Sequence, residues 1–473
     1  MLKFTNIDQI IPEKYSNKIR TKNFKEIYSR FAKKIAEEQS SRCSQCGVPF
    51  CQVHCPLQNN IPDWLQLTAE DRLEEAYEIS SATNNMPEVC GRICPQDRLC
   101  EGNCVIEQSG HGSVTIGSIE KYITDVAWEK GWIKKINVVK EKKYSVGIIG
   151  SGPAGLTAAE QLRKKGYQIY IYDRYDRPGG LLIYGIPNFK LEKEIVNKRT
   201  ERLKESGINF ILNCEIGSTI TFDEIKNKHD AILIATGVYK SRKINLNNNN
   251  ATNVVSALEF LIASNKKGLN DTVVDFDNGR LNAKDKNIVV IGGGDTSMDC
   301  VRTAIRQGAK SVKCLYRRDR KNMPGSQREV ENAIEEGVDF NWLTLPSEYL
   351  GKDKIKQTKI IRMQLGSPDE SGRRSPEPIP DSEENLETDI IIEALGFEPE
   401  ELPKMFNKNN LIITQWRTIK INYQNMMTSL DGVFAAGDIV RGASLVVWGI
   451  KDGRDVAENI HNFIQKKFLK GNK

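Results

Sequence analysis

Eight cysteines in the N-terminal part of the chain are the residues best suited to carry chemistry. Of the eleven cysteines in the sequence, eight lie between Cys43 and Cys104. They form two groups, Cys43-x2-Cys46-x4-Cys51-x3-Cys55-Pro56 and Cys90-x3-Cys94-Pro95-x4-Cys100-x3-Cys104. Close spacings with Cys-Pro steps suit thiolates that surround a compact iron–sulfur cluster. We therefore expect two 4Fe–4S clusters in this region.

Zinc is the alternative metal for these cysteines, and plain buried thiols are a further alternative. Structural zinc sites usually combine two short cysteine pairs separated by a dozen or more residues, and His often joins them. Each group here holds four cysteines in a tight run, and only His54 lies inside one of them. The pattern favours iron–sulfur clusters over zinc.

A glycine-rich turn in the middle of the chain predicts a dinucleotide site. An apolar run ends in Gly150-Ser151-Gly152-Pro153-Ala154-Gly155, and a helical pattern follows. In a Rossmann unit the first glycine makes the tight turn, the second lets the backbone approach a diphosphate, and the third lets the helix pack on the strand. The next apolar run ends in Asp173, about twenty residues after the glycines, where an acid can accept ribose hydroxyls.

Three further turns of small residues are candidates for contact with the same ligand. Glycines let a backbone pass close to a flat ligand or a diphosphate, although an ordinary turn remains the alternative for an isolated glycine pair. The turns are Gly179-Gly180-Leu181 with Gly185, Ala235-Thr236-Gly237, and Gly437-Asp438 with the apolar residues Leu445 and Val446 after it.

A second glycine-rich turn predicts a second dinucleotide site, with NADPH as its ligand. A strand pattern leads into Gly292-Gly293-Gly294-Asp295-Thr296-Ser297, in which Ser297 replaces the third glycine. The following strand ends in Arg317-Arg318 and not in an acid. Arginine at this position accommodates the 2′-phosphate of NADP, whereas an acid would favour NAD.

The elements that position these residues are expected to form three domains. Residues 1–135 are expected to form a helical iron–sulfur domain, with an amphipathic segment before Gln39 and helices over 61–83 and 114–128. Residues 144–280 and 424–473 are expected to form one α/β Rossmann-like domain, and residues 281–423 a second one inserted into it. A chain of 473 residues is long enough for several cores.

Charge and hydropathy exclude two classes of partner and indicate a cytoplasmic protein. The net charge of +6 is spread over both signs without a concentrated basic stripe, so nucleic-acid binding is not expected. No run of about 18 apolar residues is present, so no membrane span is expected, and the first residues lack the apolar core of a signal peptide.

The turns resemble those of the flavoprotein family with two dinucleotide domains, in which the first unit holds FAD. The resemblance rests on Gly150–Gly155, Ala235-Thr236-Gly237 and Gly437-Asp438 in this order. It implies that Asp173 lies on the adenosine ribose and that Gly437, Asp438 and residues 444–447 contact the flavin. The helix after the Gly-Asp turn would then direct its N-terminus at the flavin, where its partial positive charge favours an anionic reduced ring.

The complete chain resembles the family of the small subunit of NADPH-dependent glutamate synthase, and the N-terminal half of dihydropyrimidine dehydrogenase is similar in arrangement. The resemblance is carried by the first cysteine group, Val114-Thr-Ile-Gly-Ser-Ile-Glu120, Gly293-Gly294-Asp295-Thr296 and Met323-Pro-Gly-Ser-Gln-Arg-Glu329. It implies electron delivery from NADPH, through FAD and two clusters, to a large subunit that makes glutamate from glutamine and 2-oxoglutarate.

The same resemblance implies interleaved ligation of the clusters. Cys43, Cys46 and Cys51 would join Cys104 on one cluster. Cys55, Cys94 and Cys100 would hold the other with Glu120, which leaves Cys90 spare. A surface helix carboxylate remains the alternative for Glu120.

Two observations complete the functional expectation. The second dinucleotide domain contains only Cys300 and Cys314, which are too far apart in sequence for the CxxC of disulfide reductases. Hydride transfer to a flavin requires no general acid or base, so no catalytic residue is assigned. A free-standing NADPH–ferredoxin-type oxidoreductase and a non-catalytic electron-relay subunit are the alternative functions.

Overall fold

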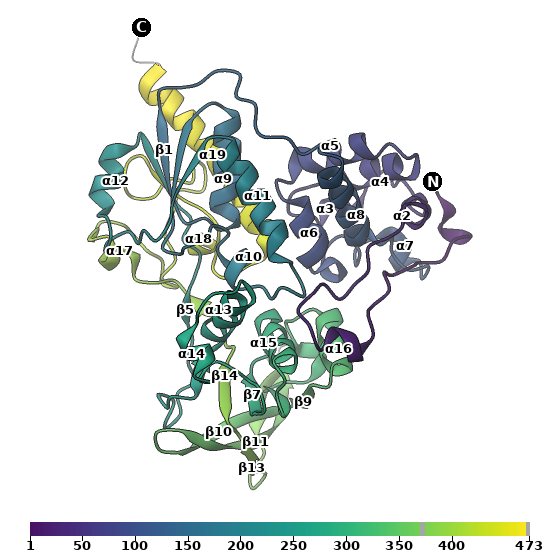
Figure 1. Cartoon of the computed structure of the whole chain (residues 1–473), viewed down its shortest axis with the longest axis vertical. Helices are drawn as coiled ribbons and strands as arrows, with labels where there is room; N and C mark the ends of the chain where they lie inside the picture. The colour runs from purple at the N-terminus through teal and green to yellow at the C-terminus, as the bar shows by residue number, and fades with distance from the viewer. Residues whose placement is uncertain (369–373, 470–473) are drawn as a thin grey trace.

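One helical part and two parallel sheets make up the computed structural model, which describes residues 1–368 and 374–469 (Figure 1). The helical part is N-terminal and is drawn in purple, the first sheet lies beside it in the upper half of the view, and the second lies below. No helix within the described residues is long and apolar enough to cross a membrane.

The N-terminal part is a cluster of short helices around one apolar core. Along α8, Ile119, Ile123 and Ala127 are fully buried, as expected for one face of a helix with about 3.6 residues per turn. The helix expected over residues 61–83 is two helices, because Asp71 takes a left-handed φ of 59° between them. The helices are η1 (Lys3–Thr5), α1 (Asn17–Arg20), α2 (Lys33–Ser41), α3 (Phe50–Val53), α4 (Ile61–Ala69), α5 (Leu73–Thr83), α6 (Pro87–Ile93), η2 (Gln96–Arg98), α7 (Val105–Gln108) and α8 (Ile116–Glu129).

The first sheet is parallel and has the strand order β16-β4-β1-β2-β3. Its strands are β1 (Ser145–Ile149), β2 (Gln168–Tyr172), β3 (Ile208–Ile211), β4 (Ala231–Ile234) and β16 (Val433–Ala435). Its helices are α9 (Pro153–Lys164), α10 (Leu181–Tyr184), α11 (Lys193–Glu205), α12 (Phe222–Lys228), α17 (Leu402–Met405), α18 (Asp438–Arg441) and α19 (Val446–Leu469). Helices α9 and α19 approach so closely that a Cβ on Gly453 would lie 2.5 Å from the carbonyl oxygen of Ala154.

The second sheet is also parallel, with the order β6-β14-β7-β8-β9, and an antiparallel sheet of β10 to β13 extends it. The strands are β6 (Val254–Ser256), β7 (Asn287–Ile291), β8 (Ser311–Tyr316), β9 (Asp339–Trp342), β10 (Thr344–Gly351), β11 (Ile355–Pro368), β12 (Arg374–Pro378), β13 (Glu384–Glu387) and β14 (Ile390–Glu393). The helices are α13 (Ala257–Gly268), α14 (Val274–Asp277), α15 (Asp295–Arg306), η3 (Arg320–Asn322) and α16 (Gln327–Glu335), and the two-stranded ribbon β5 (Lys240–Ser241) and β15 (Phe397–Glu398) connects the two sheets.

Strand pairing differs from the expected domain boundaries at residues 281 and 423. Strand β6 lies before residue 281, yet Val255 pairs with Ile392 in the second sheet, and Phe260 of α13 lies in the same core. Leu402 and Phe406 lie before residue 423, yet they belong to a core of the first sheet. A strand of three residues, two of them valines, after an Asn-rich stretch is too short a pattern to assign to one sheet. The second sheet and the antiparallel sheet beside it therefore take their strands from residues 254–368 and 374–393.

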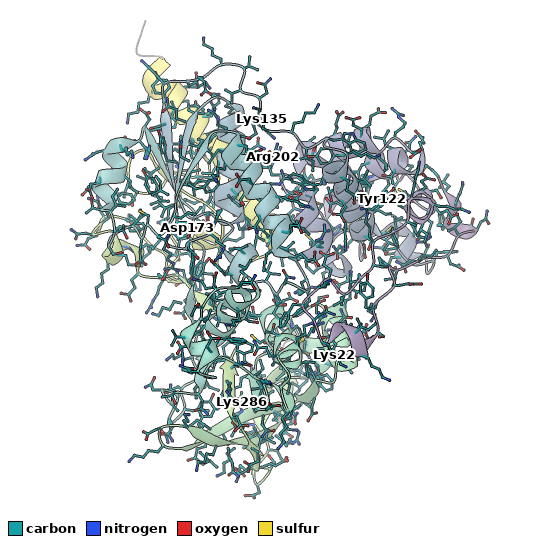
Figure 2. The ribbon with its side chains drawn as sticks, viewed as in Figure 1. Lys22, Tyr122, Lys135, Asp173, Arg202 and Lys286 are labelled. Atoms are coloured by element: carbon teal, nitrogen blue, oxygen red, sulfur yellow. The ribbon has the colours of Figure 1, made fainter. Side chains whose placement is uncertain are left out.

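Residues 14–28, which we call the N-terminal strap, lie against the second domain (Figure 1). The side chain of Arg20 is only 2% exposed and bonds Glu335 of α16 at 2.6 Å, and Lys14 reaches the same carboxylate at 2.7 Å. The backbone of Phe24 accepts a hydrogen bond from Asn188 of the first domain. Lys22 marks this crossing in Figure 2. The amphipathic helix expected before Gln39 forms only from Lys33 onward, in α2, and the chain before it is mostly irregular. Its apolar residues contact different domains: Phe24 packs against Phe189 of the first domain, whereas Phe31 lies in the helical core.

Candidate functional site

Each of two neighbouring cavities in the helical domain takes cysteines from both sequence groups. Cys43, Cys46, Cys51 and Cys104 line a cavity of about 330 Å³, which we call site I. A cavity of about 430 Å³, which we call site II, is lined by Cys55, Cys90, Cys94, Cys100 and Glu120. The cavities thus group the residues as the resemblance implies, except that Cys90 also lies at site II.

Short helices and turns present the thiols of site I. Cys51 lies in α3, and Cys104 caps the N-terminus of α7. Gln45 has a φ of 52°, and this turn places its backbone N–H 3.5 Å from the sulfur of Cys43. Burial raises the pKa of the Cys43 thiol to about 11 and that of Cys51 to about 12, and the neighbouring Cys104 adds to both. The thiols therefore need the positive charge of bound iron to exist together as thiolates.

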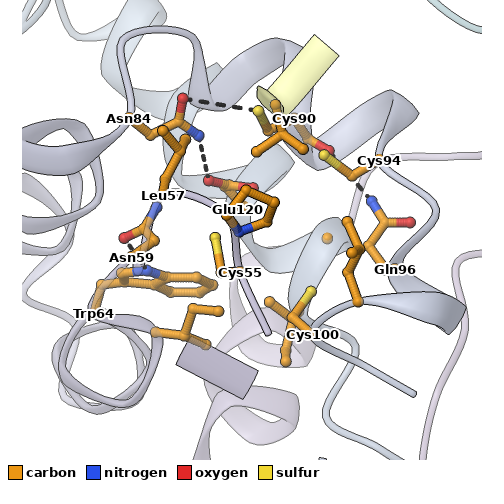
Figure 3. A pocket seen from close by; sticks show the side chains of 16 residues that line it. Cys55, Leu57, Asn59, Trp64, Asn84, Cys90, Cys94, Gln96, Cys100 and Glu120 are labelled. Atoms are coloured by element: carbon orange, nitrogen blue, oxygen red, sulfur yellow. Dashed lines mark hydrogen bonds between the residues drawn. The ribbon is translucent and has the colours of Figure 1, made fainter. Parts of the chain in front are cut away.

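Site II combines cysteine sulfurs with one carboxylate, and Asn84 connects them (Figure 3). Its amide nitrogen donates a hydrogen bond to Glu120 at 3.1 Å, and its oxygen accepts one from the thiol of Cys90 at 3.7 Å. Glu120 is 8% exposed, and burial raises its pKa to about 8. Glu120 is thus a buried carboxylate at a cysteine-lined cavity and not a surface helix carboxylate.

The arrangement of these side chains fits multi-iron clusters better than single zinc ions. Among residues 1–368 and 374–469, no three Cys, His, Asp or Glu side chains converge closely enough to hold one metal ion. A zinc ion requires four ligands at about 2.0–2.3 Å from one centre. A four-iron cluster is larger and is held by cysteines placed around it, as they are placed around these cavities.

In the first glycine-rich turn, the outer two glycines pack against neighbouring backbone, whereas the middle one has open space beside it. Gly150 has a φ of 104°, and a Cβ there would lie 2.4 Å from the carbonyl oxygen of Ala235. A Cβ on Gly155 would lie 2.1 Å from the carbonyl oxygen of Gly150. A Cβ on Gly152 would meet no described atom within 4 Å. The open space adjoins the N-terminus of α9, which begins with Pro153 and Ala154, and the free N–H groups of this first turn would stabilise a diphosphate there.

Asp173 lies at the end of β2, in the middle of the first domain (Figure 2). Its carboxylate accepts hydrogen bonds from the backbone N–H groups of Ser151 at 2.8 Å and Tyr175 at 2.9 Å. A carboxylate has about four acceptor positions, so ribose hydroxyls can still bond to it. With Thr236, it lines a cavity of about 470 Å³, and the buried hydroxyl of Thr236 has no hydrogen-bond partner among the described residues.

The remaining predicted turns surround the open space of the first turn. Gly180 has a φ of 54°, and a Cβ there would lie 2.9 Å from the Cα of Gly152. Leu181 begins α10, Gly185 follows its end, and Gly237 follows Thr236 with a φ of 70°.

Gly437 and Asp438 lie where the chain returns to the first domain. Gly437 has a φ of 78°, and a Cβ there would lie 2.9 Å from the side chain of Ala154. Asp438 accepts a hydrogen bond from Ser444 at 2.6 Å, and burial raises its pKa to about 6. Leu445 precedes α19, which begins at Val446, and the next residue, Val447, lines site II. This end of the flavin-type domain and site II therefore share a wall.

The second glycine-rich turn repeats the pattern of the first. Gly292 has a φ of 144°, and a Cβ there would lie 2.3 Å from the carbonyl oxygen of Ala394, whereas Gly294 has open space around it. Asp295 and Thr296 are the first residues of α15. Arg317 is exposed, and Arg318 has a buried Nε without a hydrogen-bond partner among the described residues.

Two features of the site give no signal in the sequence. Asn84 lies in a polar turn, and only the folded chain shows that it connects Cys90 with Glu120. Arg98 lies between two cysteines of site II, yet its guanidinium donates to the carbonyl oxygen of Pro324 at 2.6 Å in the second dinucleotide domain. Both contacts join residues that are distant along the chain.

Comparisons with known proteins agree with this arrangement. Residues 20–132 match the family described as dihydropyrimidine dehydrogenase domain II, 4Fe-4S cluster, and residues 144–457 match the family described as pyridine nucleotide-disulphide oxidoreductase. These families confirm the predicted fold class and oxidoreductase activity, and they confirm 4Fe–4S clusters over zinc.

Curated relatives cover almost the whole chain. The chain is 58% identical over 467 residues to the glutamate synthase (NADPH) small chain of Azospirillum brasilense, covering 99% of this chain and 97% of that one. It is 44% identical to the protein of the same name from Escherichia coli K12, covering 98% of each chain.

A solved structure of lower identity supports the fold alone. FprA of Mycobacterium tuberculosis in complex with NADPH has a TM-score of 0.59 and 18% identity, over 70% of this chain and 86% of that one. The relatives, with the two matched families, show that this chain belongs to the family of NADPH-dependent glutamate synthase small chains.

Proposed function

We propose that this chain is the electron-input subunit of an NADPH-dependent glutamate synthase and works in the cytoplasm with a large subunit. The large subunit would make glutamate from glutamine and 2-oxoglutarate, because no site for that chemistry is expected in this sequence. Full-length relatives named glutamate synthase (NADPH) small chain support the proposal.

The cofactors supply the redox chemistry: FAD accepts a hydride from NADPH, and the two 4Fe–4S clusters carry electrons singly. The chain supplies binding positions for each group. For FAD these are Gly150, Gly152, Pro153, Ala154, Gly155, Asp173, Gly180, Leu181, Gly185, Thr236, Gly237, Gly437, Asp438, Leu445 and Val446. For NADPH they are Gly292, Gly294, Asp295, Thr296, Arg317 and Arg318. For the clusters they are Cys43, Cys46, Cys51 and Cys104 at site I, and Cys55, Cys94, Cys100 and Glu120 at site II.

The observation that carries the proposal is the position of Val447. This residue belongs to the first turn of α19 and is the last residue of the segment expected to contact the flavin, and it also lines site II. Leu57, Met86 and Val89 of the helical domain share an apolar core with the first dinucleotide domain. The two domains are therefore in direct packing contact here, which supports short-range electron transfer between the flavin-type site and site II.

Anaerobically purified protein tests the proposal in two stages. NADPH should reduce an artificial acceptor in the presence of the small chain alone, and glutamate should form only after a large subunit is added. Absence of NADPH oxidation despite bound FAD would favour a relay subunit. Reduction of ferredoxin at full rate without any large subunit would favour a free-standing reductase.

A further inference from the structure

An arginine of the iron–sulfur domain lies at the rim of the second glycine-rich turn. Arg98 is the last residue of η2, between Cys94 and Cys100. One guanidinium nitrogen donates to the carbonyl oxygen of Pro324 at 2.6 Å, and another lies 3.5 Å from the carboxylate of Asp295. Asp295 is the first residue of α15, directly after Gly294. An element of the cluster domain thus reaches the expected diphosphate position of the other cofactor site.

The loop that carries Pro324 covers part of the same turn. The backbone N–H of Gly325 donates to the carbonyl oxygen of Gly293 at 3.0 Å, and the N–H of Ser326 donates to Asp295 at 2.9 Å. Over Gly294 itself, a Cβ would meet no described atom within 4 Å. The loop therefore holds the side of the turn and leaves the space above Gly294 open.

The charges at this turn favour a nearby cation. The first N–H groups of α15 favour an anion, but the carboxylate of Asp295 at the same helix end would repel a diphosphate. One oxygen of Asp295 accepts from Ser326, and the other faces Arg98. The side chain of Arg98 is 45% exposed, so part of its planar fork remains available to a ligand.

We propose that Arg98 binds the diphosphate of NADPH across the domain boundary and offsets the charge of Asp295. This inference rests on the proposed function, because it takes the second turn as the NADPH site. Arg98 acts on the part of the coenzyme that NADPH and NADH share, whereas Arg317 and Arg318 act on the 2′-phosphate. A bidentate guanidinium suits phosphate oxygens, and its contribution falls as salt increases.

The alternative explanation is that Arg98 only fastens η2 to the loop. Arg328 provides the matched control, because it joins the same two segments without facing the turn. Its guanidinium donates to the side-chain oxygen of Gln96 at 3.1 Å and lies 3.6 Å from Glu101. A loosened interface would affect both variants alike, whereas a lost phosphate contact would affect only the variant of Arg98.

Equilibrium binding to the oxidised holoprotein tests the inference with two ligands. The variants are Arg98→Gln, Arg98→Lys and Arg328→Gln, each verified by iron content and by the EPR spectrum after reduction. The ligands are NADP⁺, which has the diphosphate, and adenosine 2′-monophosphate, which lacks it. Arg98→Gln should raise the Kd for NADP⁺ about tenfold and leave that for adenosine 2′-monophosphate within about twofold. Arg98→Lys should lose about threefold, and Arg328→Gln less than about twofold.

Three results would overturn the assignment: unchanged NADP⁺ affinity in Arg98→Gln, equal losses in Arg98→Gln and Arg328→Gln, or equal losses for the two ligands. If the Arg98→Gln protein contains no iron, the Arg98→Lys protein is used to test whether Arg98 contacts the diphosphate. The salt dependence of the NADP⁺ affinity of Arg98→Lys then decides. A wild-type protein that binds no NADP⁺ would instead contradict the proposed function.

Discussion

Alanine at Gly152 should weaken flavin binding, whereas alanine at Gly155 should weaken the fold, because only Gly152 has open space for a ligand beside it. At Gly152 the backbone has a φ of −73°, which any residue adopts, and a Cβ meets no described atom within 4 Å. At Gly155 a Cβ would lie 2.1 Å from the carbonyl oxygen of Gly150. The first substitution should therefore spare the fold and obstruct the diphosphate, whereas the second should damage the fold itself.

The magnitudes follow from these contacts. Gly152→Ala should change the free energy of unfolding of the flavin-free protein by less than about 1 kcal/mol, since reduced chain entropy and a poorer helix cap oppose each other. Gly155→Ala overpacks a strand–helix contact, which costs about 1–3 kcal/mol, or several degrees in Tm. FAD affinity should fall at least about tenfold in Gly152→Ala.

Two measurements on purified protein check this prediction. The flavin-to-protein absorbance ratio reports binding, and circular dichroism during heating reports the stability of the flavin-free form. Gly294→Ala serves as the replicate in the second domain and should reduce NADP⁺ affinity while leaving FAD content unchanged, because Gly294 also has open space around it. Full flavin content in Gly152→Ala, with a normal Tm in Gly155→Ala, would refute the reasoning.

Three further predictions concern the metal site, a domain interface and pH. Glu120→Ala should change the EPR spectrum of one cluster while Cys90→Ala leaves both intact, and unchanged spectra in Glu120→Ala would remove that carboxylate from site II. Arg199→Met should destabilise the protein by about 3–5 kcal/mol in urea unfolding, because Glu88, which it bonds at 2.7 and 2.8 Å, would remain buried and unpaired; Glu88→Gln in the same chain should recover most of this loss. Burial lowers the pKa of His229 to about 4, so the folded state binds its proton less readily than the unfolded state. Stability should therefore be intact above about pH 6.5 and fall toward pH 4, by about 2 kcal/mol at pH 5, and His229→Gln should flatten this dependence in pH-resolved melting curves.

Features that depend on local geometry could be predicted from the sequence. Gly150 and Gly292 both need a positive φ, and the strand, turn and helix around them have regular spacing, so each turn could be recognised without knowledge of the rest. The two cysteine groups could also be recognised from the sequence, because a cluster needs thiols at short intervals along the chain. These local requirements account for the confirmed order of an iron–sulfur domain followed by dinucleotide-binding domains.

Features that depend on contacts between distant segments could not be predicted. Asn84 and Arg98 are ordinary polar residues in turns until the fold places them beside Glu120 and Pro324. Strand β6 has only three residues, so its sheet is set by pairing with β14 and not by its own pattern. The periodicity before Gln39 indicated a helix, but only the part from Lys33 onward is helical, and the apolar residues before it make their contacts from irregular chain.

The N-terminal strap also has a consequence for biosynthesis. Asn17 bonds the backbone of Glu335, 318 positions later, so the ribosome must translate most of the polypeptide before this contact can form. The cysteine-rich region of the nascent chain therefore emerges long before the strap can dock. During this time window, iron can be delivered to the cluster region before the strap joins it to the second dinucleotide domain. Slowing translation between residues 104 and 335 should lengthen that window.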